Sequence, residues 1–74
     1  MYKVGDMVRI RDLPVGAGND PLDPYLWYNS AMKKMAGQIY RIGSVCGSRY
    51  ILLRDSNCWQ WTDAFLIPAR QRTE

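Results

Sequence analysis

The chain has 74 residues, which is enough for one small domain and leaves no room for a second. Hydrophobic residues make up 47% of the sequence and charged residues 23%, and this balance excludes a disordered chain. Ten basic and seven acidic residues give a net charge of +3, a mild excess without the basic stripe typical of nucleic-acid binders. No apolar run is long enough for a signal peptide or a membrane span, so we expect a cytoplasmic protein that does not contact membranes.

The first predicted element is a strand within residues 2–11, YKVGDMVRIR. A Gly-Asp turn signal precedes residues that alternate, and we assign Val8 and Ile10 to the core face. Residues 12–28, DLPVGAGNDPLDPYLWY, contain three prolines and two glycines, which exclude a helix or a central strand. We therefore expect a long first loop, and a loop of this length in so small a domain is often functional.

The next segment, residues 29–36 (NSAMKKMA), predicts one short helix. Asn29 or Ser30 is the expected N-cap, because their side chains can accept a hydrogen bond from a free backbone N–H. Gly37 is expected to end the helix. The two methionines share one face, and so short a helix requires that this face pack against the rest of the protein.

Four further strands complete the pattern, with a helical turn capped by Thr62 or Asp63 before the last of them. These strands are predicted at Gln38–Val45, Arg49–Arg54, Cys58–Trp61 and Leu66–Ile67. The layout predicts a mainly β fold, a small five-stranded SH3-like barrel with a long first loop, one short helix and a single helical turn before the last strand. The barrel is expected to span residues 1–69, and residues 70–74 a flexible basic tail.

Two tryptophans lie two residues apart in the stretch CWQWTD, at positions 58–63. On a strand they share one face. We assign Trp61 to the core, where its N–H would need an acceptor, and expect Trp59 to be half-exposed at the rim. This stretch is therefore predicted to stabilise the fold rather than to bind a ligand.

Catalysis and metal binding find no support in the sequence. There is no histidine to act as a general base, and nothing visible activates Cys46 or Cys58 as a nucleophile. Asp20 and Asp23 are better explained as turn formers than as a catalytic pair. We expect neither an enzyme, nor a cofactor, nor a metal site. Free thiols are expected, while a Cys46–Cys58 disulfide across a hairpin stays open.

Three stretches resemble a known pattern: VGDMVRI at 4–10, MKKMAGQ at 32–38 and WQWTDAFL at 59–66. They are similar to small SH3-like barrels related to the mind-bomb-type repeat, with single-domain versions in bacteria and their phages. The shared features are a Gly-Asp before an alternating strand, an Ala-Gly helix end, and Trp-Thr-Asp followed by a leucine. The resemblance implies binding of peptides or protein surfaces, and no catalytic residue carries over. Residues 12–28 depart from the pattern, so we place the individual character of this protein in the loop.

The loop ends in a dense group of aromatic residues beside acidic ones, and interface centres favour Trp and Tyr. We therefore predict a non-enzymatic protein-binding module. Tyr25 and Tyr28 are expected to be exposed, and Trp27 is left open between exposure and closing the barrel end. The predicted contacts are Asp20, Asp23, Tyr25, Trp27 and Tyr28, with Arg49 and Arg54 as flanking contacts. Size and resemblance together suggest an inhibitor from a phage or mobile element that occupies a surface of a host defence protein such as a CRISPR nuclease.

Two alternatives remain open. The first is a nucleic-acid-binding small barrel, since Arg9, Arg41 and other arginines lie on strands beside tyrosines that can stack on bases. The three loop aspartates would repel a phosphate backbone, so this alternative is the weaker one. The second is a homo-oligomer that binds a small nucleotide signal at its interface. The sequence does not decide whether the loop or the basic strand face is the binding surface.

Overall fold

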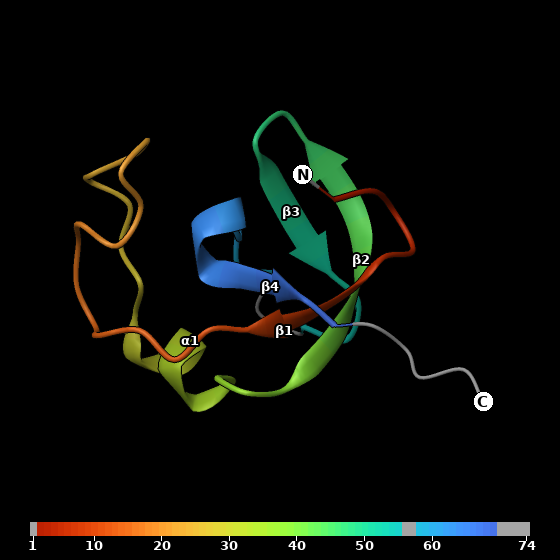
Figure 1. Ribbon diagram of the computed structural model, residues 1–74, viewed down its shortest axis with the longest axis horizontal. Coiled ribbons are helices and arrows are strands. Elements are labelled where there is room, and N and C mark those ends of the chain that lie inside the picture. The colour runs from red at the N-terminus through yellow and green to blue at the C-terminus, as the bar shows by residue number, and fades with distance from the viewer. Residues whose placement is uncertain (1, 56–57, 70–74) are drawn as a thin grey trace.

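The computed structural model describes residues 2–55 and 58–69. Four antiparallel strands form one sheet in the order β3-β2-β1-β4, with the helix α1 beside it (Figure 1). The elements are β1 (Met7–Ile10), α1 (Ser30–Lys34), β2 (Ile39–Cys46), β3 (Arg49–Leu52), the 3-10 turn η1 (Asp63–Phe65) and β4 (Leu66–Pro68). The predicted mainly β fold is confirmed. The described residues form one unclosed sheet of four strands, and the predicted tail at 70–74 lies outside them.

The predicted fourth strand, Cys58–Trp61, does not form. Only Trp61 pairs, through two backbone hydrogen bonds of 3.0 and 2.8 Å with Tyr50 of β3. The chain before it takes left-handed backbone conformations, with φ of 67° at Arg54 and 53° at Cys58. Asp55 then holds the segment, because its backbone carbonyl accepts from the N–H of Cys58 and its carboxylate from the N–H of Trp59. These local bonds replace the ladder that a strand would have made.

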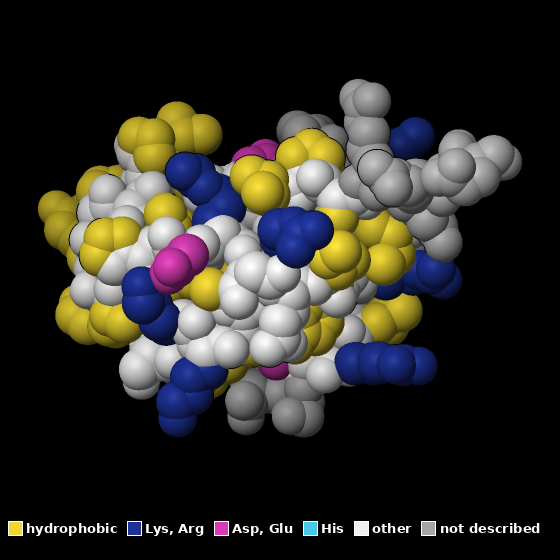
Figure 2. Space-filling view, turned by 60° about the horizontal axis from the view of Figure 1, so that its bottom comes forward, with side chains coloured by type: hydrophobic (Ala, Val, Ile, Leu, Met, Phe, Trp, Pro, Cys, Tyr) yellow, Lys and Arg dark blue, Asp and Glu magenta, His cyan; other side chains and the backbone are white. Residues whose placement is uncertain are grey.

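The register of the sheet places alternate residues on two faces. Val8 of β1 lies opposite Tyr40 of β2 and opposite Pro68 of β4, and its side chain is buried. The neighbours on β1, Met7 and Arg9, point away from the core, as the alternation requires. Figure 2 shows one side of the molecule, on which Lys and Arg side chains lie among hydrophobic ones with few acidic side chains between them.

A bulge bends β2 where it passes from β1 to β3. The register with β3 shifts between Ile42 and Ser44, at Gly43. A Cβ at Gly43 would lie 2.7 Å from Cδ2 of Leu53, so the close approach of the two strands favours glycine here. A bulge increases local twist and lets the strand curve around the core.

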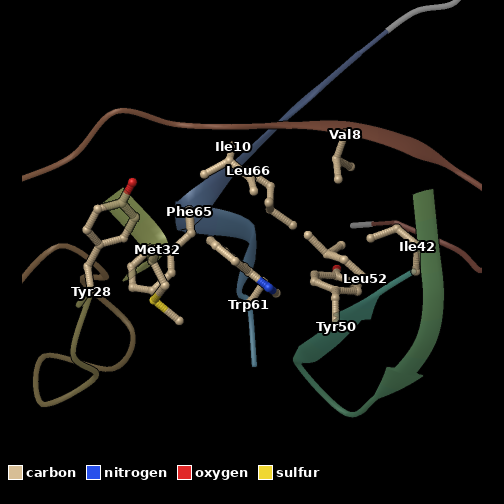
Figure 3. Close-up of a cluster of buried hydrophobic side chains, with 10 residues drawn as sticks. All are labelled: Val8, Ile10, Tyr28, Met32, Ile42, Tyr50, Leu52, Trp61, Phe65 and Leu66. Atoms are coloured by element: carbon tan, nitrogen blue, oxygen red, sulfur yellow. The ribbon is translucent and has the colours of Figure 1, made fainter. Parts of the chain in front are cut away.

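The core consists of ten buried hydrophobic side chains among the described residues, drawn in Figure 3. Trp61 lies between Tyr28 and Met32 on one side and Leu52 and Tyr50 on the other. The prediction that Trp61 belongs to the core is confirmed, and Trp59 is half-buried as expected. The core residues are Val8, Ile10, Tyr28, Met32, Ile42, Tyr50, Leu52, Trp61, Phe65 and Leu66.

The short helix α1 ends the long loop and anchors it on the sheet. The Asn29 side chain accepts a hydrogen bond of 2.8 Å from the backbone N–H of Met32, which confirms it as the N-cap. After the helix, Gly37 has a φ of 81°, and its N–H donates to the carbonyl of Ile10 at 2.7 Å. Met32 is buried in the core. Packing and β1 contacts therefore stabilise a helix that would not form in isolation.

Candidate functional site: the tip of the first loop

The segment between β1 and α1 projects to one side of the sheet (orange to yellow in Figure 1). Its base is closed by Gly16 and Tyr28, which exchange two backbone hydrogen bonds of 2.9 Å each. Within the loop, the side-chain amide of Asn19 donates to the carbonyl of Pro14 at 2.7 Å. The loop therefore has a hydrogen-bonded structure of its own.

Two consecutive turns with the same chemistry build the far end of the loop. The N–H of Asp23 donates to the carbonyl of Asp20, and the N–H of Leu26 donates to that of Asp23, both at 3.1 Å. Each turn begins with Asp, continues with Pro and places a large apolar residue third, as in DPLD and DPYL. Proline at the second position has the backbone angle that such turns require, and Asp is favoured at the first.

The third residues of the two turns, Leu22 and Tyr25, are the most exposed large hydrophobic side chains among the described residues. Leu22 is 94% exposed, Tyr25 90% and Trp27 57%. We call these three residues the loop tip. Exposed apolar side chains of this size cost a folded protein solubility, so the loop tip is the candidate contact surface.

An ion pair fastens the loop to the sheet. Arg49 of β3 donates to the carboxylate of Asp23 and also, at 3.3 Å, to the side-chain carbonyl of Gln60. Between the loop and η1 lies a small hollow of about 270 Å³, bordered by this pair and by Leu22, Ser48 and Thr62. The partners Asp23 and Arg49 are both half-buried, so the attachment is only partly accessible to water.

The structure brings some of the predicted contact residues together on the loop and buries others. Tyr25, Trp27, Asp23 and Arg49 lie on the loop or at its attachment, and the predicted exposure of Tyr25 is confirmed. Trp27, left open by the sequence, is exposed. Asp20 is 6% exposed, and its carboxylate accepts the N–H of Leu22 at 2.9 Å, so it shapes the turn instead of offering a charge to a partner.

The predicted exposure of Tyr28 is wrong. Its ring is fully buried and packs edge-to-face on Phe65, with 5.1 Å between the ring centroids. Its hydroxyl donates to the carbonyl of Arg11 at 2.6 Å, which satisfies the phenol inside the core. Burial raises the pKa of Tyr28 above its ordinary value. A phenol can be buried without loss when it finds such an acceptor.

Arg54 lies apart from the loop tip. It borders a different hollow, together with Met7, Ile39 and Leu53. Sequence reasoning also missed Leu22, the most exposed of the three tip residues. The signal was present in the repeated Asp-Pro-apolar pattern, which places Leu22 and Tyr25 at equivalent turn positions.

Several chemical possibilities can be compared with this geometry. Within residues 2–55 and 58–69, no group of three or more His, Cys, Asp or Glu side chains could hold a metal ion. Cys46 and Cys58 are both exposed free thiols, so they do not form the disulfide that the sequence left open. The described part of the chain has no helix of sufficient length and apolarity to cross a bilayer.

Neither a family model, nor a curated protein, nor a solved structure matches the chain.

Proposed function

We propose that this chain is a non-enzymatic protein-binding module whose main contact surface is the loop tip. The observation that carries the proposal is the near-complete exposure of Leu22 and Tyr25 on a backbone fixed by two hydrogen-bonded turns. Side chains presented on an ordered backbone lose little conformational freedom on binding, which favours affinity. Tyr and Trp are the residue types that most often dominate binding energy at protein interfaces.

The side chains of the loop tip indicate what kind of partner surface they would fit. An aromatic ring, an indole and a leucine side chain fit an apolar groove or pocket, and the Asp23–Arg49 pair beside them supplies a polar rim. A module that fits such a groove or pocket acts by occupying it. The further expectation, an inhibitor of a host defence enzyme such as a CRISPR nuclease encoded by a phage or mobile element, rests on size and the family resemblance.

We also propose that the fold is an SH3-like barrel in which the fourth strand is reduced to a single bridge. Three features support this proposal. The first strand lies between the second and the last, β2 is bulged between its two partners, and a 3-10 turn precedes β4. The Tyr50–Trp61 bridge occupies the edge of β3 where a fourth strand would pair. An experimental structure in solution would decide whether this edge closes.

The test of the proposed function is affinity capture from a lysate of the organism that encodes the protein. We compare the wild type with Tyr25→Ser/Trp27→Ala and with a control, Val4→Ser, which also alters an exposed hydrophobic side chain outside the loop. The wild type and the control should retain the same protein, and the loop variant should lose it while keeping its melting temperature. Retention of the same protein by the loop variant would contradict the proposal, as would failure of the wild type to retain any.

A second copy of the chain is the alternative occupant of the loop tip, and an oligomer could hold a small nucleotide signal at its interface. Sedimentation over a range of protein concentrations separates this alternative from a monomeric module. If the wild type forms dimers and Tyr25→Ser/Trp27→Ala is a monomer, the tip is a self-association surface. If both are monomers, the tip is not a self-association surface.

A further inference from the structure

The outer face of the sheet combines arginines with aliphatic side chains. Across the three strands β4, β1 and β2, the register places Ile67, Arg9 and Ile39 side by side. In the next row Met7 lies opposite Arg41, and the N–H of Leu53 donates to the Arg41 carbonyl at 2.9 Å. We call the set Met7, Arg9, Ile39, Arg41, Leu53, Arg54 and Ile67 the sheet face.

The sheet face is open to solvent and hollowed. A shallow depression of about 600 Å³ lies over it, bordered by Met7, Ile39, Tyr40, Arg41, Leu53 and Arg54. Ile39, Leu53 and Ile67 are 47%, 51% and 41% exposed. Apolar and basic side chains mixed in this way are visible on the side of the molecule in Figure 2.

Within residues 2–55 and 58–69, no carboxylate forms an ion pair with an arginine of the sheet face. The ion pairs within the described residues, Lys33–Asp12 and Arg49–Asp23, lie elsewhere. Arg9 donates to the carbonyl of Gly37 and Arg41 to the sulfur of Met7, and neither contact carries a negative charge. A guanidinium group that is held in place without a carboxylate is prepared for one from a partner.

The carboxylates of the described residues are mostly buried or paired within the molecule. Every described aspartate accepts a hydrogen bond within its own molecule, at Asp6, Asp12, Asp20, Asp23, Asp55 and Asp63. An accepted hydrogen bond leaves the charge of a carboxylate in place, but Asp20 and Asp55 are buried. Asp12 and Asp23 are paired with Lys33 and Arg49. A second copy of the described chain therefore offers few carboxylates to set against these arginines. Charge complementarity instead favours a different, acidic molecule.

We infer that the sheet face binds an acidic protein segment in which carboxylates alternate with apolar side chains. The arginines would pair with the carboxylates, and Ile39, Leu53 and Ile67 would bury the apolar residues. Single-stranded nucleic acid fits less well. It is bound by aromatic rings on which bases stack, whereas the exposed large hydrophobic side chains of this face are aliphatic. Tyr40, which also borders the depression, is partly buried and packs against the core. This surface is separate from the loop tip, so the inference does not depend on the proposed function.

The experiment measures fluorescence anisotropy with a labelled short peptide of alternating Glu and Leu. The comparison probes are a Glu-Ser peptide of the same length, which keeps the charge without the apolar residues, and an oligo-dT of similar length. We expect the Glu-Leu peptide to bind about tenfold more tightly than the Glu-Ser peptide, because both components of the surface contribute. Tighter binding of the oligo-dT, or no preference for Glu-Leu, would overturn the inference.

Variants locate the peptide on the surface. Arg41→Gln should weaken binding of the Glu-Leu peptide about twofold to fivefold, whereas Lys34→Gln, which removes the same charge from α1, should leave it unchanged. Tyr25→Ser/Trp27→Ala should also bind the peptide as the wild type does, which separates this surface from the loop tip. Equal binding by Arg41→Gln and Lys34→Gln, or loss of binding in the loop variant, would contradict the assignment.

Discussion

The indole N–H of Trp61 donates to the carboxylate of Asp55 at 3.1 Å, and both residues are buried. The same carboxylate accepts the backbone N–H of Trp59, also at 3.1 Å. Asp55 follows β3 closely, so one side chain connects the end of that strand to the tryptophan at the centre of the core. Through this hydrogen bond, the segment that leads to Trp61, which forms no strand, is held to the core.

Asp55→Ala should lower the free energy of unfolding by about 2–3 kcal/mol, because the buried indole N–H and a backbone N–H lose their acceptor. Asp55→Asn should lose less, since its amide oxygen can still accept from Trp61. Chemical denaturation followed by tryptophan fluorescence measures both values. Equal losses in the two variants would contradict the hydrogen-bond explanation and point to the charge.

Gly43→Ala should destabilise the protein by about 1 kcal/mol, because the new methyl group would meet the side chain of Leu53 at the β2 bulge. Leu53 is half-exposed and can move, which limits the loss. The double variant Gly43→Ala/Leu53→Ala removes the clash and should be about as stable as Leu53→Ala alone. If Gly43→Ala costs the same in both backgrounds, contact with Leu53 is not the cause.

The ion pair between Asp23 and Arg49 should control the order of the loop more than global stability. Exposed and half-buried pairs are worth about 0.5–1 kcal/mol, so Asp23→Ala should shift the melting temperature little. Hydrogen exchange at the N–H of Leu26, which donates into the second turn, should become several-fold faster. Arg49→Ala should have the same effect, and the two changes together should add nothing further. Unchanged exchange in either variant would contradict the anchoring role.

The alternating strands could be predicted from the sequence because their signal is periodic. Val8 and Ile10 recur every second residue, as a half-buried strand requires, and both are buried in the core. The same logic failed at Cys58–Trp61, where the alternation is equally clear. The left-handed backbone at Cys58 and the hydrogen bonds to Asp55 determine that segment, and the pattern of apolar residues carries no sign of either.

Exposure within the loop could be predicted only in part. Tyr25 and Tyr28 are the same residue type three positions apart, yet one is 90% exposed and the other is fully buried. Their difference comes from the turn that presents Tyr25 and from the pairing with Gly16 that directs Tyr28 inward. No regular period links the residues of such a loop. The repeated Asp-Pro was the one local signal available, and it also identifies Leu22.

Alkaline pH should destabilise the protein through its buried phenols. Burial raises the pKa values of Tyr28 and Tyr50 above the ordinary value of 10.0, so the unfolded chain releases these protons at a lower pH than the folded protein does. This contribution to stability is complete below pH 10 and is lost as the pH rises through the raised values. Tyr28→Phe removes the hydrogen bond to the Arg11 carbonyl, so its free energy of unfolding at neutral pH should be about 1 kcal/mol lower. Above about pH 10, its free energy of unfolding should fall less steeply than that of the wild type. Denaturation at neutral pH and over a series above about pH 10 measures how steeply the free energy of unfolding falls. Tyr25→Phe, which changes an exposed ring, is the matched control and should follow the wild type. If the free energy of unfolding of Tyr28→Phe fell with pH as steeply as that of the wild type, the role of this phenol would be contradicted.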